Sequence, residues 1–110
     1  MSSNQPWLEH YPEGVPHDID PGLYPSINAM IEEAFERFRH RPAFANFGRV
    51  LSYDDIDRLS ANFAAFLAHD LQLQRGDRVA IMMPNVLQYP IALFGVLRAG
   101  LIVVNTNPLY

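Results

Sequence analysis

The sequence has 110 residues, 49% hydrophobic and 18% charged, which fits one globular domain or part of one and excludes a disordered chain. There is no Cys, which excludes disulfides and thiolate chemistry. The formal charge is −4 and all eight basic residues are Arg, which argues against nucleic-acid binding and excludes lysine chemistry. No apolar run reaches the roughly 18 residues of a membrane span. The polar start, Met1–Gln5, is unlike a signal peptide, so we expect a cytoplasmic chain.

Proline dominates residues 1–25, which hold five of the nine prolines. Each proline fixes φ and removes a backbone donor, so we expect neither a helix nor a central strand here. Large apolar side chains are interspersed: Trp7, Leu8, Tyr11, Leu23 and Tyr24. Since large aromatics gain most from burial, we expect an extended arm laid along a folded body, with a loose tail as the alternative.

The next segment, 26–40, has the pattern of an amphipathic helix. Ser26 is a good N-cap, and basic residues gather at the other end, ahead of Pro42. Apolar residues recur at helical spacing: Ile27, Met30, Ile31, Ala34, Phe35 and Phe38. Residues 26–110 are predicted to form the folded body.

A short β-hairpin is predicted over 43–52, with Gly48-Arg49 between two apolar runs. A second helix is predicted over 53–71, with Ser52 as its cap and acidic residues in its first turn. Its expected buried face consists of Ile56, Leu59, Phe63, Phe66, Leu67 and Leu71.

Two compact apolar runs, within 78–83 and 101–104, predict buried strands. Because neither run alternates with polar residues, each strand should be covered on both faces, as in a parallel sheet. With the helix between them they form a βαβ unit at about 78–105. The expected fold class is therefore α/β, a partial doubly wound sheet, and two such strands call for further strands and helices beside them.

The connecting helix, about 86–99, is apolar nearly all round and should be buried. Asn85 and Gln88 predict an N-cap box, and Pro90 is expected to kink the helix or delay its first regular turn. Gly100 stands where a C′ glycine is expected.

Candidate site residues each have a simpler structural explanation. The histidines are His10, His17, His40 and His69. None has the spacing of a metal ligand pair, which favours surface positions. The acidic cluster of Asp54, Asp55 and Asp57 suggests a metal or paired-carboxylate site, but a helix first turn accounts for it better.

The carboxyl edge of the predicted sheet offers two loops. The turn Met83–Val86 contains no glycine, so a dinucleotide site is not expected there. The segment Asn105–Asn107 is polar and follows a strand, at the edge where open α/β sheets bind ligands. Turn chemistry ahead of Pro108 is the simpler explanation and the favoured interpretation.

From Leu51 onward the chain resembles the adenylate-forming enzymes: acyl-CoA synthetases, peptide-synthetase adenylation domains and luciferases. The matching blocks are Leu51–Asp57, Arg75–Asn85, Gly95–Gly100 and Val104–Tyr110. Within that superfamily, the run Pro84–Gly95 and the opening Pro6-Trp7-Leu8, Tyr11-Pro12 and Gly14–Pro16 look like bacterial long-chain fatty-acid–CoA ligases. The whole chain is similar to roughly the first fifth of such an enzyme.

The resemblance implies a parent enzyme that activates a long-chain fatty acid with ATP and Mg²⁺ to an acyl-adenylate, releasing pyrophosphate. CoA then displaces AMP. The family's phosphate loop, adenine motifs and catalytic lysine would lie beyond Tyr110, so no catalytic, cofactor-binding or metal residue is assigned here. This chain alone should act as scaffold, inactive and without bound cofactor.

Two other function classes stay open: a stand-alone α/β interaction module, and part of another acyl-, aryl- or amino-acid-adenylating enzyme. The resemblance leaves room for peripheral association at the inner membrane, because fatty acids partition into lipid, although no helix here is basic and interfacial. An uncovered sheet edge predicts that the isolated chain self-associates.

Overall fold

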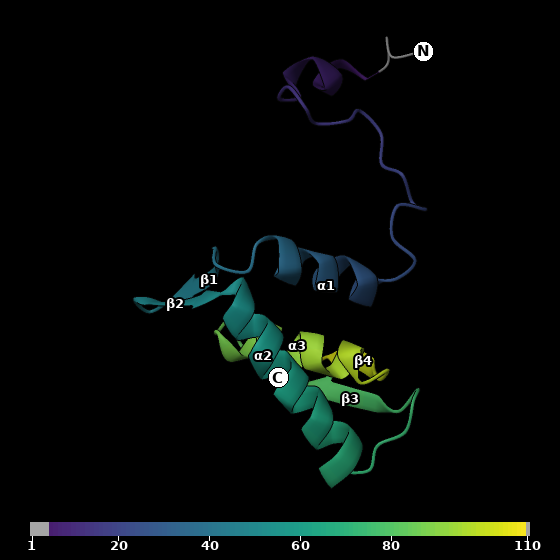
Figure 1. The fold of residues 1–110 in the computed structure, drawn as a ribbon, viewed down its shortest axis with the longest axis vertical. Helices are drawn as coiled ribbons and strands as arrows, with labels where there is room; N and C mark the ends of the chain where they lie inside the picture. The colour runs from purple at the N-terminus through teal and green to yellow at the C-terminus, as the bar shows by residue number, and fades with distance from the viewer. Residues whose placement is uncertain (1–4, 110) are drawn as a thin grey trace.

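The computed structural model describes residues 5–109; positions 1–4 of the predicted arm and Tyr110 of the last motif lie outside the described residues. In chain order the elements are a 3-10 helix Pro6–His10, α1 Ile27–Arg37, β1 Pro42–Asn46, β2 Arg49–Ser52, α2 Tyr53–Ala65, a π-helix Phe66–Asp70, β3 Arg78–Ile81, α3 Gln88–Arg98 and β4 Ile102–Asn105 (Figure 1). The predicted α/β class, with its hairpin, βαβ unit and two further helices, is confirmed. No helix in the described range is both long and apolar enough to cross a bilayer.

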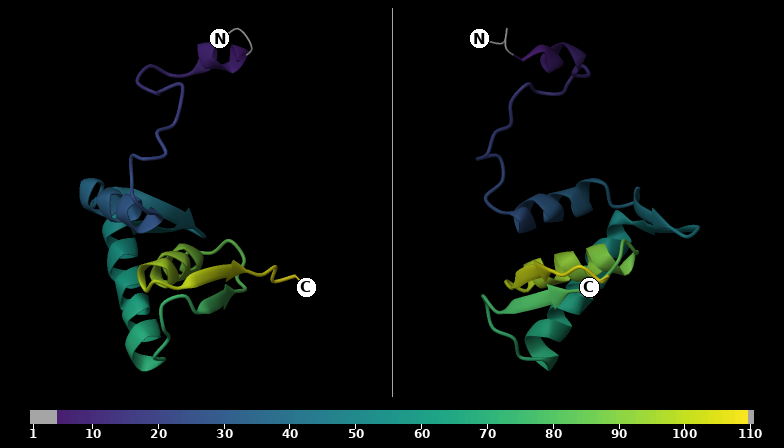
Figure 2. Two further views of the ribbon diagram at one scale, coloured as in Figure 1. Left: turned by 90° about the vertical axis from the view of Figure 1, so that its right-hand side faces the viewer. Right: turned by 180° about the vertical axis from the view of Figure 1, so that it is seen from behind.

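The N-terminal arm is extended, but it does not lie along the body. Figures 1 and 2 show it running away from α1. Trp7 and Tyr11 keep 52% and 37% of their surface exposed, so the expected packing on the body is wrong for these two aromatics. Tyr24, next to α1, is half-buried. The expectation of no helix also fails at Pro6–His10, where proline occupies a first-turn position that needs no N–H.

The N-caps predicted for the first two helices are present. The Ser26 hydroxyl accepts a hydrogen bond from the Ala29 N–H at 3.1 Å, at the start of α1. At the start of α2, the Ser52 hydroxyl accepts from the Asp55 N–H while the Asp55 carboxylate accepts from the Ser52 N–H. This reciprocal capping box satisfies two donors that would otherwise lack partners.

Helix α1 ends at Arg37, earlier than predicted, because the chain after it bonds to the start of α2. The carbonyl of Arg39 accepts from the Asp54 N–H at 2.9 Å, and the carbonyl of Arg41 accepts from the Tyr53 N–H at 3.0 Å. Tertiary bonds thus replace the last helical turn.

The hairpin forms a two-stranded antiparallel sheet of its own, apart from the parallel pair. Asn46 pairs with Arg49, which leaves Phe47 and Gly48 as a two-residue turn. Both have positive φ, 50° and 76°, the signature of a type I′ turn.

The βαβ unit is formed as predicted. Strands β3 and β4 pair in parallel, from Arg78 opposite Ile102 to Ile81 opposite Asn105. Helix α3 joins them and ends at Gly100, whose φ is 78°. The Gly100 and Leu101 N–H groups return to the carbonyls of Leu97 and Val96, which is the Schellman closure.

The start of α3 differs from the prediction. Its N-cap is Leu87, without a side-chain cap bond, so the box expected from Asn85 and Gln88 is wrong. Pro90 lies in the first turn, where a missing N–H breaks no helical bond. No residue from Tyr89 to Ala99 is exposed, but only Pro90, Ala92, Gly95 and Val96 are fully buried, so the predicted burial of this helix is met in part.

The core has two parts, one at each end of α2. One cluster gathers Leu67, Ile81, Ala92, Val96 and Leu101, and the other gathers Ile31, Phe35 and Ile56. Phe66 and Leu71 were expected in this core but are exposed. They lie on the π-helix and just after it, where the changed winding turns them away from α3.

Helix α3 covers one face of the parallel pair (Figure 2). Val79, Ile81 and Val103 pack in the core cluster on that side. On alternate positions, Ile102 and Val104 stay 46% and 40% exposed. Within residues 5–109, the predicted covering of both sheet faces is therefore met on one face only.

Helices α2 and α3 cross very closely, and glycine makes this approach possible. A Cβ built on Gly95 would lie 2.7 Å from Phe63 Cδ2 and 3.1 Å from the Ser60 carbonyl oxygen. The Ser60 carbonyl oxygen belongs to the backbone and cannot be moved by a rotamer change. Any side chain at position 95 would therefore force the two helices apart.

Gly95→Ala is expected to lower the free energy of unfolding of the purified chain by about 1–3 kcal/mol, because overpacking strains the crossing. Gly22→Ala is the matched control, since its Cβ would meet only Asp20 Oδ1 at an ordinary 3.4 Å. Urea denaturation of both variants tests the prediction, and equal midpoints would contradict it.

Candidate functional site

The carboxyl end of the parallel pair is the polar edge singled out by the sequence. Here the Tyr89 hydroxyl donates to Asn105 Oδ1, linking the first turn of α3 to the end of β4. Thr106 continues the ladder, with its N–H bonded to the Ile81 carbonyl at 3.0 Å. Asn107 Oδ1 accepts from the Leu109 N–H at 2.9 Å, so this residue serves the turn, as favoured.

A groove of about 400 Å³ lies beside this edge, between the hairpin and the start of α3. It is lined by Phe44, Ala45, Asn46, Asn85, Val86, Leu87, Tyr89 and Pro90. Asn46 Nδ2 donates to the Asn85 carbonyl at 3.0 Å. Tyr89 both lines the groove and bonds Asn105, so the apolar groove and the polar edge adjoin each other.

These residues can orient a ligand but supply little chemistry. The edge and groove carry amide and phenol groups and apolar side chains, with no carboxylate, imidazole or guanidinium among their lining residues. Sequence reasoning found Asn105 and missed Tyr89 and Asn46. Tyr89 follows an apolar helical pattern, and Asn46 is 39 positions from its partner, so neither gave a local signal.

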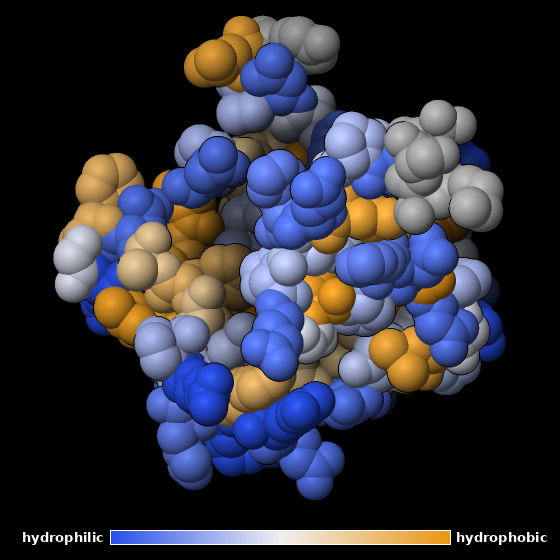
Figure 3. Space-filling view, turned by 90° about the horizontal axis from the view of Figure 1, so that it is seen from above, coloured by the Kyte–Doolittle hydropathy of each residue, from blue (hydrophilic) through white to orange (hydrophobic). Residues whose placement is uncertain are grey.

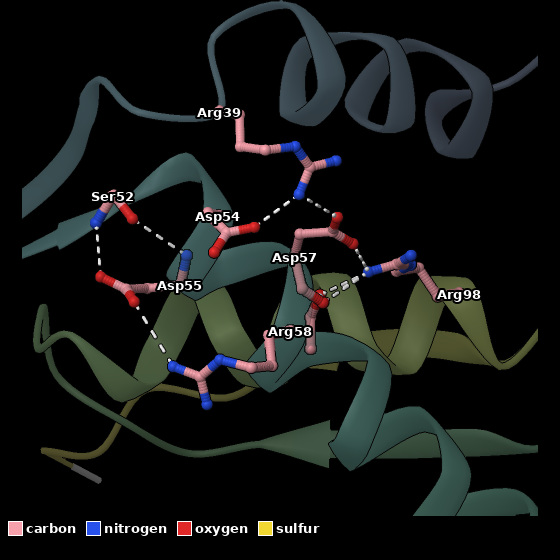
Figure 4. A network of polar contacts seen from close by, with 8 residues as sticks. Arg39, Ser52, Asp54, Asp55, Asp57, Arg58 and Arg98 are labelled. Atoms are coloured by element: carbon pink, nitrogen blue, oxygen red, sulfur yellow. Dashed lines mark hydrogen bonds and ion pairs between the residues drawn. The ribbon is translucent and has the colours of Figure 1, made fainter.

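The three clustered aspartates are engaged by arginines and caps (Figure 4). Asp54 bonds Arg39 after α1. Asp57 lies 3.6 Å from Arg39 and 2.9 Å from Arg98 of α3. The cluster joins three helices through ion pairs, which makes it a structural network.

Arg98 is the centre of this network. Its Nη1 lies 2.9 Å from the Asp57 carboxylate, the Asp57 carbonyl and the Ser60 hydroxyl. Its guanidinium also lies over the Phe35 ring, 5.4 Å from the centroid. Arg98 is the one charged residue in the apolar helical segment 86–99. An isolated charge of this kind is the sequence signal that indicates a polar partner inside the fold.

Asp55 differs from its neighbours because it belongs to the capping box. The Ser52 backbone N–H, and then the Ser52 hydroxyl, hold the pKa of this carboxyl below its usual value. A carboxyl with a lowered pKa stabilises the fold above its unfolded pKa, and this stabilisation is lost as pH falls through the folded value. The first turn of α2 should therefore be the acid-sensitive part of the network.

The histidines are scattered and exposed: His10 in the arm helix, His17 against the Tyr11 ring, His40 after α1 and His69 in the π-helix. Within residues 5–109, no three His, Cys, Asp or Glu side chains gather closely enough to hold a metal ion.

Comparison with known proteins gives one family. A family described as AMP-binding enzyme matches residues 31–110. The chain is 58% identical over 104 residues to a long-chain-fatty-acid–CoA ligase of Yersinia pestis, which covers 94% of this chain and 18% of that protein. The chain thus spans less than a fifth of the length of this relative.

Solved structures share the fold. The N-terminal subdomain of Klebsiella oxytoca NpsA superimposes with a TM-score of 0.73 at 24% identity, covering 77% of this chain and 22% of that one. Mycobacterium smegmatis MbtA gives 0.70 at 31% identity, covering 76% and 16%. The first likeness concerns the fold alone.

Arg98→Met is expected to cost about 1–3 kcal/mol of unfolding free energy, because Ser60 is fully buried and Asp57 largely so, and both lose their partner. Arg58→Met is the matched control, since its pair with Asp55 is longer, at 3.4 Å, and more exposed. The control should change stability by about 1 kcal/mol at most. Urea denaturation compares them, and an equal loss in both variants would refute the central role of Arg98.

Proposed function

Because this chain belongs to the AMP-binding enzyme family, we propose that it is the scaffolding N-terminal part of a long-chain fatty-acid–CoA ligase. The proposed enzyme joins a long-chain fatty acid to CoA through an acyl-adenylate made from ATP. The observation that carries the proposal is the 58% identity to such a ligase across 94% of the chain.

The packing supports a scaffolding role for these residues. The strongest sequence patterns form the helix crossing at Gly95 and the core around Val96. The polar groups in the family-like blocks bond to one another, as Arg98 does with Asp57. A sheet face with exposed Ile102 and Val104 has the apolar character of a surface to be covered by more of a larger domain.

The turn after β3 is unsuited to binding the phosphates of ATP. The turn after β3 has no glycine through which backbone amides could approach a phosphate, and α3 begins at a Pro-containing first turn. We therefore assign no step of the reaction to this chain. The cofactors belong to the proposed whole enzyme, for which we also propose a cytoplasmic location.

A chimera tests the proposal directly. Replacing the matching segment of the Yersinia pestis ligase with this chain should preserve fatty-acid-dependent acyl-CoA synthesis within about threefold, because core packing tolerates volume-conserving exchange. The control chimera carries the matching segment of MbtA, 31% identical to this chain, and should lose most soluble activity. Inactive but well-folded protein from the first chimera would overturn the proposal.

A substitution in the same chimera separates scaffold from ligand contact. Val103→Asp places a carboxylate in the β4 core position and should sharply reduce soluble yield, since an unpaired buried charge is costly. The soluble remainder should keep an unchanged KM for fatty acid. Normal yield with a raised KM would instead indicate direct contact with the acyl chain.

The alternative is an interaction module without catalysis. It predicts a stable monomer from the 110 residues, whereas the scaffolding role predicts self-association through the exposed sheet face. Sedimentation of the purified chain distinguishes the two, with a clean monomer at high concentration favouring the module.

A further inference from the structure

We propose that the β1–β2 hairpin is a docking element for anionic lipid surfaces, with Phe47 entering the headgroup region and Arg41 and Arg49 binding lipid phosphates. This inference goes beyond the proposed catalytic role and stands on different residues. It rests on the conformation of Phe47, on the charge of the surrounding chain and on the apolar surface beside the tip.

Phe47 is the outermost side chain of the hairpin turn. It is 91% exposed, and its φ of 50° lies in the left-handed region. Asn or Gly normally occupies this turn position, since bulky side chains are strained there. The fold therefore gains neither burial nor a relaxed backbone from this phenylalanine, and a contact outside the chain would account for it.

The charge around the hairpin is opposite to that of the whole chain. Residues 37–53 contain four of the eight arginines and no Asp or Glu, although the chain carries −4. Arg37 and Arg39 pair with Glu33 and Asp54. Arg41 and Arg49 have no ion pair within residues 5–109 and are exposed.

These two arginines flank the hairpin, and the Arg41 guanidinium also lies over the Phe38 ring, 5.3 Å from its centroid. Arg41 immediately precedes β1 and Arg49 opens β2, beside Phe47. Exposed arginine near a bilayer with anionic lipids contributes about fivefold in affinity per residue. An aromatic tip between two cations is the arrangement that an interfacial lipid contact requires.

Apolar surface continues from the tip. Val50 is exposed, and Phe44 is both exposed and part of the groove lined by Val86 and Leu87. Figure 3 shows hydrophobic side chains at this end of the molecule, around a hollow. A lipid surface can therefore meet a continuous apolar area behind the inserted ring.

A bilayer suits this surface better than a folded protein does. A stable protein interface needs about 600–1,000 Å² from each partner, whereas the contact proposed here centres on one inserted ring. A bilayer accepts one inserted aromatic with flanking cations.

The test uses Phe47→Asn, which creates an Asn-Gly turn. Because Asn-Gly is the preferred type I′ sequence, this variant should unfold at an equal or higher temperature. Its partitioning onto vesicles of equal phosphatidylcholine and phosphatidylglycerol should fall about tenfold. A variant that binds these vesicles as the unchanged chain does would overturn the proposal.

Two matched controls sharpen the result. Ile19→Asn removes an arm side chain that is 89% exposed, and it should not change partitioning onto the vesicles. A loss equal to that of Phe47→Asn would indicate nonspecific hydrophobic adsorption and would reject the hairpin as the docking element. Arg49→Gln should lose about fivefold on the mixed vesicles and nothing on pure phosphatidylcholine, whereas Arg78→Gln should change neither. If Phe47→Asn fails to fold, the comparison of Arg49→Gln with Arg78→Gln tests the proposal. Equal partitioning of these two variants onto the mixed vesicles would reject it.

Discussion

The close crossing of α2 and α3 is the constraint on which the rest of the structure depends. Gly95 brings the backbone of α3 against Ser60 and Phe63, and Arg98 bonds the buried Ser60 and the neighbouring Asp57 across the same contact. Helix α1 and the hairpin then pack on one end of α2, and the parallel strands lie beyond α3. A wider crossing would separate both core clusters at once.

This arrangement explains why the charged residues here are structural. Three aspartates in four positions would repel one another, but Arg39, just after α1, and Arg98 of α3 pair with Asp54 and Asp57. Asp55 is held by the Ser52 capping box and pairs with Arg58. Each carboxylate is thereby satisfied within the fold. The chain contributes rigidity and shape to the proposed ligase, and its polar chemistry is used internally.

Two uncovered surfaces remain, and they differ in character. The outer face around Ile102 and Val104 is aliphatic and flat, as expected of a sheet that continues into a larger domain. The hairpin end joins two exposed aromatic side chains, Phe44 and Phe47, to the exposed Arg41 and Arg49. The different chemistry of the two surfaces suits different partners: more of a larger domain for the sheet and, as proposed, a lipid surface for the hairpin.

The sequence by itself determined the elements, because helix caps, the C′ glycine and apolar periodicity act over a few residues. Ser26, Ser52 and Gly100 have the roles that their positions predict. Only the tertiary structure decided that Asn105 meets Tyr89, that α1 ends early and that Arg98 reaches Asp57. These contacts join residues 12 to 41 positions apart, and their geometry is set by how closely the helices cross, which local patterns do not encode.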